Sequence, residues 1–226
     1  MAVIVQSRPR DSTRLATAGR RERGRDGLVF LAREPTLAIV MAVAFVSLLF
    51  MTASASAEVF FAKDVLDVGD LGYGALISSW TAGMVVGAVA VARRITAAAL
   101  SVGALAAIAL QGLGIALPTL WLVFGFALLG YLFGGVAHGT KNVLVRTLIH
   151  LRVPERLHGR AFAAYNAIRN SAELVALAGG GLLVAAVGAR VTLFVAGVVP
   201  TGAALVALAL ARRRLLAPVN PDPATA

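Results

Sequence analysis

Apolar residues fill six long stretches of this chain, and short polar or charged segments separate them. The stretches cover about 36–60, 72–92, 96–116, 119–151, 161–187 and 191–211. A helix needs roughly 20 apolar residues to cross a hydrocarbon core of about 30 Å. The pattern therefore predicts six membrane-spanning helices, which occupy nearly everything after residue 35.

Composition agrees with this interpretation. Of the 226 residues, 59% are hydrophobic and 14% are charged, whereas a soluble domain carries about 25% charged residues. The charges gather in the connecting segments, including the acidic loop at 63–70. We expect a basic, largely flexible cytoplasmic segment at 1–35, a six-helix transmembrane bundle at 36–212 and a disordered cytoplasmic tail at 213–226.

The basic residues predict the orientation of the chain. If there are six spans, seventeen of the 21 lysines and arginines lie on one side, and only Lys63 and Arg190 lie on the other. Lysine and arginine are enriched in cytoplasmic loops. We therefore expect a multi-pass protein of the cell membrane with both termini in the cytoplasm. Because these residues sit at the ends of spans rather than on one folded face, we expect no nucleic-acid partner.

Glycines recur at the spacing that allows close helix packing. Gly-x-x-x-Gly pairs occur at Gly83 and Gly87, at Gly130 and Gly134, and at Gly135 and Gly139. Helices in lipid associate through close backbone approach at such small residues. The pairs predict packing within the bundle, with dimerisation as the alternative. The run 179–181 adds a bend, a hinge or a close crossing in the fifth span.

The fifth span carries the most informative polar residues. Asn166, Arg169, Asn170 and Glu173 follow a spacing that places them on one helix face. Arg169 and Glu173 are four residues apart and can pair directly. Charges inside a span tend to face a cavity or one another. The face is either a structural ion pair that holds the span to a neighbour or the lining of a substrate or proton pathway.

Two other spans contribute candidates for that pathway. His138 and Lys141, with Asn142, share one face of the fourth span. If that helix projects beyond the membrane, Lys141 merely extends its ammonium group to the surface, and His138 alone can equally be a packed polar residue. Glu58 lies near the outer end of the first span, where it is either an interfacial residue or a group involved in proton coupling.

Signs of catalysis or cofactor binding are lacking in the sequence. The chain has no cysteine, no Gly-x-x-x-x-Gly-Lys phosphate-binding loop and no His-Glu-x-x-His motif. It also lacks an aspartate pair inside a span. We therefore expect a protein that is not an enzyme and that holds no cofactor or metal.

Residues 20–215 resemble the C-terminal half of a major facilitator superfamily transporter, closest to the drug and siderophore exporters. The segment Gly27 to Leu37 is similar to the entry into helix 7 of that family, and Val153 to Arg160 is similar to the loop between helices 10 and 11. Glu173 to Arg190 is similar to helix 11 and its turn into helix 12. The resemblance implies an all-α membrane protein whose six transmembrane helices form one half-bundle of a major facilitator type fold.

The resemblance also implies a function and partners. Such halves contain three-plus-three inverted repeats, and the substrate path lies between two halves. We expect proton-coupled efflux of an unknown small molecule, with the lipid bilayer and an N-terminal six-helix half, or a second copy of the chain, as partners. The half could be encoded elsewhere or be missing from this gene model. The alternative is a non-transporting membrane protein, either a truncated remnant or an accessory subunit.

Overall fold

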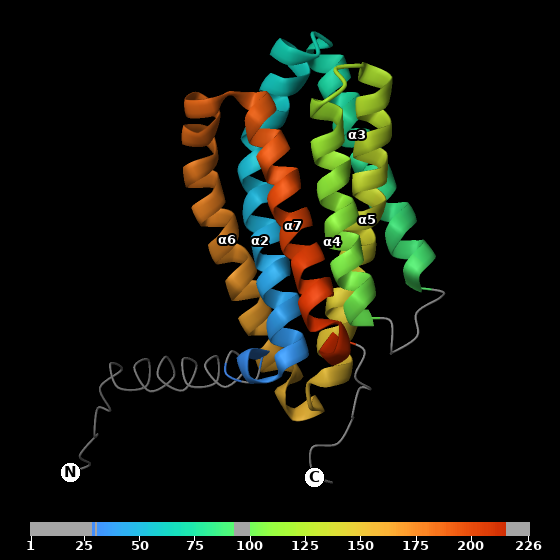
Figure 1. The fold of residues 1–226 in the computed structure, drawn as a ribbon, viewed down its shortest axis with the longest axis vertical. Helices are drawn as coiled ribbons and strands as arrows, with labels where there is room; N and C mark the ends of the chain where they lie inside the picture. The colour runs from blue at the N-terminus through green and yellow to red at the C-terminus, as the bar shows by residue number, and fades with distance from the viewer. Residues whose placement is uncertain (1–28, 30, 93–99, 216–226) are drawn as a thin grey trace, which may run out of the picture.

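The computed structural model describes residue 29, residues 31–92 and residues 100–215, and this part of the chain is helical without a β-strand. Six long helices form the bundle in Figure 1: α2 (Pro35–Phe60), α3 (Gly69–Ala92), α4 (Leu100–Ala116), α5 (Phe124–Arg152), α6 (His158–Val187) and α7 (Ala189–Leu215). Three short helices connect them: η1 (Phe61–Val65), η3 (Leu117–Thr119) and η4 (Glu155–Leu157).

The long helices are arranged by packing in an order that differs from their order in the sequence. The main contacts join α6 to α2, α2 to α7, α7 to α4, α4 to α5 and α5 to α3. In Figure 1 this order runs across the view from α6 to α3. Helices α2 and α5 also touch, as do α5 and α6, so the row curves and brings helices from both halves of the chain around a common space.

The sequence accounts for where several helices begin and end. Pro35 stands in the first turn of α2, where its missing N–H is not needed, and the Glu34 carboxylate accepts a hydrogen bond from the Leu37 N–H. Between α6 and α7, Gly188 has φ of 81°, a conformation that only glycine adopts readily. The chain can therefore reverse direction there within a single residue.

Paired glycines bring α3 and α5 into close backbone contact. A Cβ added at Gly83 would lie 2.2 Å from the Leu132 carbonyl oxygen, and one at Gly87 would lie 2.0 Å from that of Val136. On the other helix, a Cβ at Gly135 would lie 2.1 Å from the Trp80 oxygen. Gly139 meets Met84 in the same way. These two Gly-x-x-x-Gly pairs pack within the bundle, as one of the two sequence hypotheses predicted.

Other close approaches involve different pairs of helices. Gly112 of α4 and Gly197 of α7 face each other, since a Cβ added to either would lie 2.3 Å from the carbonyl oxygen of the other. Gly130 and Gly134 border α4. In the predicted run 179–181, a Cβ at Gly180 would lie 2.6 Å from the Ala53 oxygen of α2, so Gly180 serves a close crossing with α2, whereas a Cβ at Gly179 or Gly181 would meet no heavy atom within 4 Å.

Five of the long helices are long and apolar enough to cross a membrane, which fits a multi-pass membrane protein: α2 with η1, α3, α4 with η3, α6 with η4, and α7. Helix α5 has 29 residues but a more polar sequence. The predicted bounds differ from the observed ones at several ends. The first helical segment continues through η1 to Val65, α5 begins five residues later than predicted, at Phe124, and α7 continues to Leu215. The predicted terminal segments lie mostly at 1–28 and 216–226, outside the described residues.

Candidate functional site

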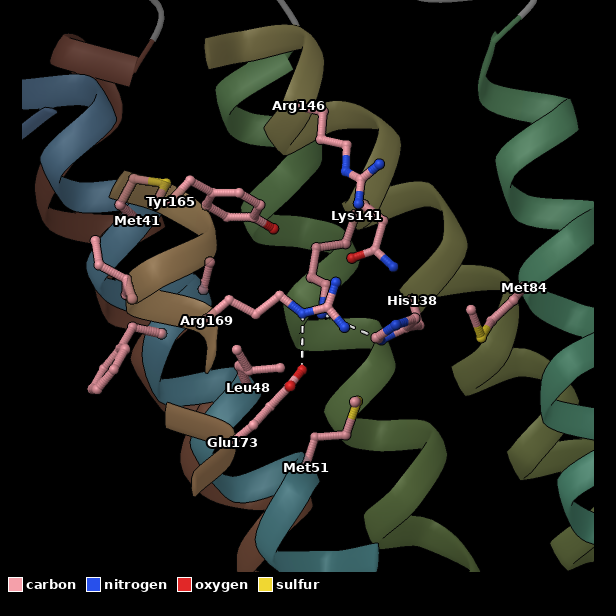
Figure 2. A pocket seen from close by; sticks show the side chains of 14 residues that line it. Met41, Leu48, Met51, Met84, His138, Lys141, Arg146, Tyr165, Arg169 and Glu173 are labelled. Carbon is pink, nitrogen blue, oxygen red and sulfur yellow. Dashed lines mark hydrogen bonds and ion pairs between the residues drawn. The ribbon is translucent and has the colours of Figure 1, made fainter. Parts of the chain in front are cut away.

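A pocket of about 310 Å³ lies where α2, α5 and α6 meet, with Met84 of α3 at its edge. Figure 2 shows its side chains pointing toward a common space from these helices. The polar side chains of the lining are His138, Lys141, Asn142, Arg146, Tyr165, Arg169 and Glu173. The remaining lining is apolar and comes mostly from α2: Met41, Ala44, Phe45, Leu48 and Met51, with Ile168 and Met84.

An ion pair stands on the α6 wall of this pocket. Arg169 Nε donates to Glu173 Oε1 at 2.8 Å, one helical turn apart. The Arg169 side chain is 44% exposed and the Glu173 side chain is 34% exposed. The pair therefore faces an open space and is not buried between helices. Figure 2 shows the Arg169 side chain extending from α6 toward Lys141 and His138 of α5. The geometry therefore provides an accessible pair of opposite charges on the pocket surface.

A chain of polar contacts crosses from the α5 wall into the core. Lys141 Nζ lies 3.3 Å from His138 Nδ1, which in turn lies 3.2 Å from Gln111 Oε1 of α4. Gln111 Nε2 donates to Met51 Sδ of α2 at 3.2 Å. His138 and Lys141 are only 8% and 5% exposed. The contacts thus hold two buried basic groups in fixed positions between α2, α4 and α5.

The atom His138 Nδ1 has two neighbours, Lys141 Nζ and Gln111 Oε1, and it can form a hydrogen bond with only one of them at a time. An ammonium group on Lys141 has donors only, so it requires an unprotonated Nδ1. If Nδ1 carries the proton, it can donate to Gln111 Oε1 instead. A proton on Nδ1 and a donated bond from Lys141 are therefore alternatives, and this arrangement allows the two residues to exchange a proton. The Trp80 ring covers the imidazole at a centroid distance of 5.5 Å.

A second pocket of about 290 Å³ continues along the same face of α2 toward its C-terminal end. Its lining includes Glu58 and Trp80, and it shares Met51 and Glu173 with the first pocket. Glu58 therefore lies in a cavity at the junction of α2, α3 and α6. The two pockets together follow α2, with Glu173 at their common boundary.

The structure brings together some of the predicted residues but not all of them. His138, Lys141, Arg169 and Glu173 line one pocket, and Glu58 lines the adjoining one. Asn166 and Asn170 are exposed and contribute to neither lining. The α6 face at the pocket instead contains residues 165, 168, 169 and 173, because the helix is turned slightly from the predicted stripe.

Sequence reasoning missed several members of the site. Arg146 lies on the same stripe, two turns after His138 and one turn after Asn142, so helical spacing alone could have identified it. Tyr165 could have been found in the same way, three residues before Ile168. Gln111 could not, because it comes from α4 and reaches His138 only through the packing of the bundle.

Metal binding finds no support in the described residues, where no three histidine, aspartate or glutamate side chains gather as metal ligands would. What the site offers is an apolar wall, two buried basic groups and an accessible ion pair. In comparisons with known proteins, no family model, no curated protein and no solved structure matches the chain.

Proposed function

We propose that the chain is one six-helix half of a major-facilitator-type secondary transporter and that it moves a small molecule across the cell membrane in exchange for protons. The observation that carries the proposal is the pocket between α2, α5 and α6. It contains the buried Lys141 and the accessible pair Arg169–Glu173 inside a bundle of apolar helices. Ionisable residues at membrane depth are costly, and they commonly mark substrate or proton pathways.

Helix α5 is the sixth span in this proposal. Its 29 residues correspond to roughly 44 Å at 1.5 Å per residue, which exceeds the hydrocarbon thickness. Its polar residues His138 and Lys141 are buried, whereas Leu129, Leu132 and Phe133 are 65%, 38% and 46% exposed. The outer face is thus apolar around these residues, and the buried His138 and Lys141 lower the average hydropathy from inside the bundle. Six spans place both termini on the same, arginine-rich side.

The packing pattern supports the three-plus-three organisation of such a half. Exchanging the first three helices for the last three replaces α2, α3 and α4 with α5, α6 and α7. The contact of α3 with α5 then becomes that of α6 with α2, and α4 with α5 becomes α7 with α2. The contact of α4 with α7 is unchanged. The five main contacts are therefore preserved by the exchange, as expected for two inverted repeats.

The pocket contains residues from both repeats, because α2 belongs to the first and α5 and α6 to the second. In transporters of this architecture the substrate path lies at the interface of repeats and halves. The second half is a separate chain or a second copy of this one. In either case, the second half would contact the side of the bundle along which the two pockets follow α2.

Transport measurements on the purified full chain in proteoliposomes test this function. With an imposed pH gradient, currents on a solid-supported membrane are recorded while a library of small molecules is applied. We expect at least one chemical class to give a current that Glu173→Gln abolishes, because this variant removes the accessible carboxylate that pairs with Arg169 at the boundary of the two pockets. Glu155→Gln, which removes an exposed carboxylate outside both pockets, is the matched control. The absence of any current above that of empty liposomes would instead favour a non-transporting protein.

A further inference from the structure

The charges around the larger pocket are unbalanced. Its lining contains three basic side chains, Lys141, Arg146 and Arg169, and a single carboxylate, Glu173. Glu173 is already paired with Arg169 at 2.8 Å. Among the described residues, no carboxylate forms an ion pair with Lys141 or Arg146. The pocket as a whole therefore offers positive charge that the protein itself does not neutralise.

Lys141 is the more informative of these two groups. Its side chain is 5% exposed, and its hydrogen-bond partner is the uncharged or cationic His138 rather than an acid. A buried ammonium group loses much hydration energy and requires a compensating anion or strong acceptors. Figure 2 shows Lys141 and Arg146 on successive turns of α5, beside the same cavity. An anion that pairs with both side chains would therefore lie inside the pocket.

The opposite wall of the pocket has different chemistry. Helix α2 contributes Met41, Phe45, Leu48 and Met51, and none of these side chains carries a charge. Methionine side chains adapt to varied apolar shapes because they are flexible and polarisable. A volume of about 310 Å³ lies at the small end of the range for small-molecule sites. The wall therefore suits the apolar body of a small ligand.

We propose that this pocket binds a small organic anion, with its acid group on Lys141 and Arg146 of α5 and its apolar body on α2. The inference rests on the proposed function, because the occupant is the molecule to be transported. A cationic ligand would meet three basic side chains and a carboxylate that is already paired. A neutral ligand would leave Lys141 buried without a counter-ion.

Quenching of Trp80 by brominated probes tests the proposal. The chain has two tryptophans, and Trp121 is 59% exposed at the far end of the bundle. Trp121→Phe therefore leaves Trp80, whose ring lies beside His138, as the only reporter. The full chain is placed in phosphatidylcholine nanodiscs and titrated with 4-bromobenzoate, 4-bromobenzamide and 4-bromobenzylammonium. These probes share a shape and differ in charge.

We expect saturable quenching by the benzoate and only linear, partition-type quenching by the amide and the ammonium compound. Lys141→Gln should weaken benzoate binding by about tenfold or more, because it removes a charge-assisted contact in a dry site. Arg146→Gln, at the exposed mouth, should weaken it about threefold and serves if Lys141→Gln does not fold. Arg156→Gln removes an exposed positive charge outside the pocket and should leave the affinity unchanged.

Three results would overturn the anion site. The ammonium probe could bind as tightly as the benzoate, or the affinity of a folded Lys141→Gln or Arg146→Gln variant could equal that of the parent. Anionic phosphatidylglycerol in the nanodiscs could also abolish the quenching, which would identify a lipid headgroup as the occupant. Benzoate binding without any transport current would refute the proposed function alone. Transport of a cation without benzoate binding would refute only the anion site.

Discussion

Replacing Gly135 with alanine tests whether α3 and α5 depend on close backbone contact. The added Cβ would lie 2.1 Å from the Trp80 carbonyl oxygen and 2.9 Å from its carbonyl carbon. Both atoms belong to the backbone of α3, so no side-chain rotation can relieve the overlap. Ordinary van der Waals contact begins near 3.4 Å. The helices would therefore have to separate by roughly 1 Å at this point, which forfeits a large share of the local dispersion energy.

The expected cost follows from that displacement. Overpacking a tight interface destabilises proteins by about 1–3 kcal/mol. The neighbouring contacts at Gly83, Gly87 and Gly139 lie on the same interface and weaken as the helices separate. Alanine regains up to about 1 kcal/mol through its higher helix propensity. We expect a net loss of about 2 kcal/mol, or a decrease in Tm of about 4–8 °C for a chain of this size.

Gly125→Ala is the matched control on the same helix. A Cβ at Gly125 has no heavy atom within 4 Å, so this variant should be as stable as the parent or slightly more stable. Thermal unfolding of both variants in one detergent, followed by circular dichroism, provides the comparison. A Gly135→Ala protein with a Tm equal to that of Gly125→Ala would refute the packing argument, because the same substitution would then cost nothing at a 2.1 Å backbone contact.

Three further predictions follow from other parts of the structure. The Tyr131 hydroxyl is buried without a hydrogen-bond partner, so Tyr131→Phe should leave the free energy of unfolding unchanged or raise it by up to about 1 kcal/mol; a loss above that would show that the hydroxyl is paired. Arg152 Nη1 donates to Glu34 Oε1 at 2.8 Å, and both side chains are little exposed. A double-mutant cycle with Arg152→Ala and Glu34→Gln should give a coupling free energy of about 1–2 kcal/mol. A coupling free energy near zero would contradict the link between α2 and α5. The chain has no cysteine, so a cysteine introduced by Ser7→Cys or by Thr225→Cys can be labelled alone. With six spans, a membrane-impermeant maleimide should label neither variant in intact cells and both variants after permeabilisation. Labelling of just one variant in intact cells would indicate an odd number of spans.

The fold was more accessible to sequence reasoning than the site was. Long apolar stretches predict helices well because hydrophobic length depends on local sequence alone, and the reversal at Gly188 was visible for the same reason. Helix α5 was predicted within the stretch 119–151, although the buried His138 and Lys141 lower its average hydropathy. The contribution of Gln111 could not be predicted at all, since it depends on the packing of α4 against α5 in the bundle.

The faces of the helices showed the same limit. The spacing of Asn166, Arg169, Asn170 and Glu173 predicted one shared face of α6. It could not say which edge of that face meets α2 and α5, and the structure selects Arg169 and Glu173 but leaves both asparagines outside the pockets. Rotation of a helix about its axis is determined by its neighbours, and therefore by tertiary packing, which spacing within one helix does not encode.

The distribution of glycine contacts bears on how the pocket can change shape. Among the described glycines, those whose added Cβ would fall within 3.0 Å of another helix's backbone join α3 to α5, α4 to α5, α4 to α7 and α2 to α6. None of them joins α2 to α5 or α5 to α6, the two junctions beside the pocket. The rigid contacts therefore form two groups, α2 with α6 and α3 with α4, α5 and α7. A change in the width of the pocket would have to shift these two groups against each other along the contact of α2 with α7, without separating any of these glycine contacts.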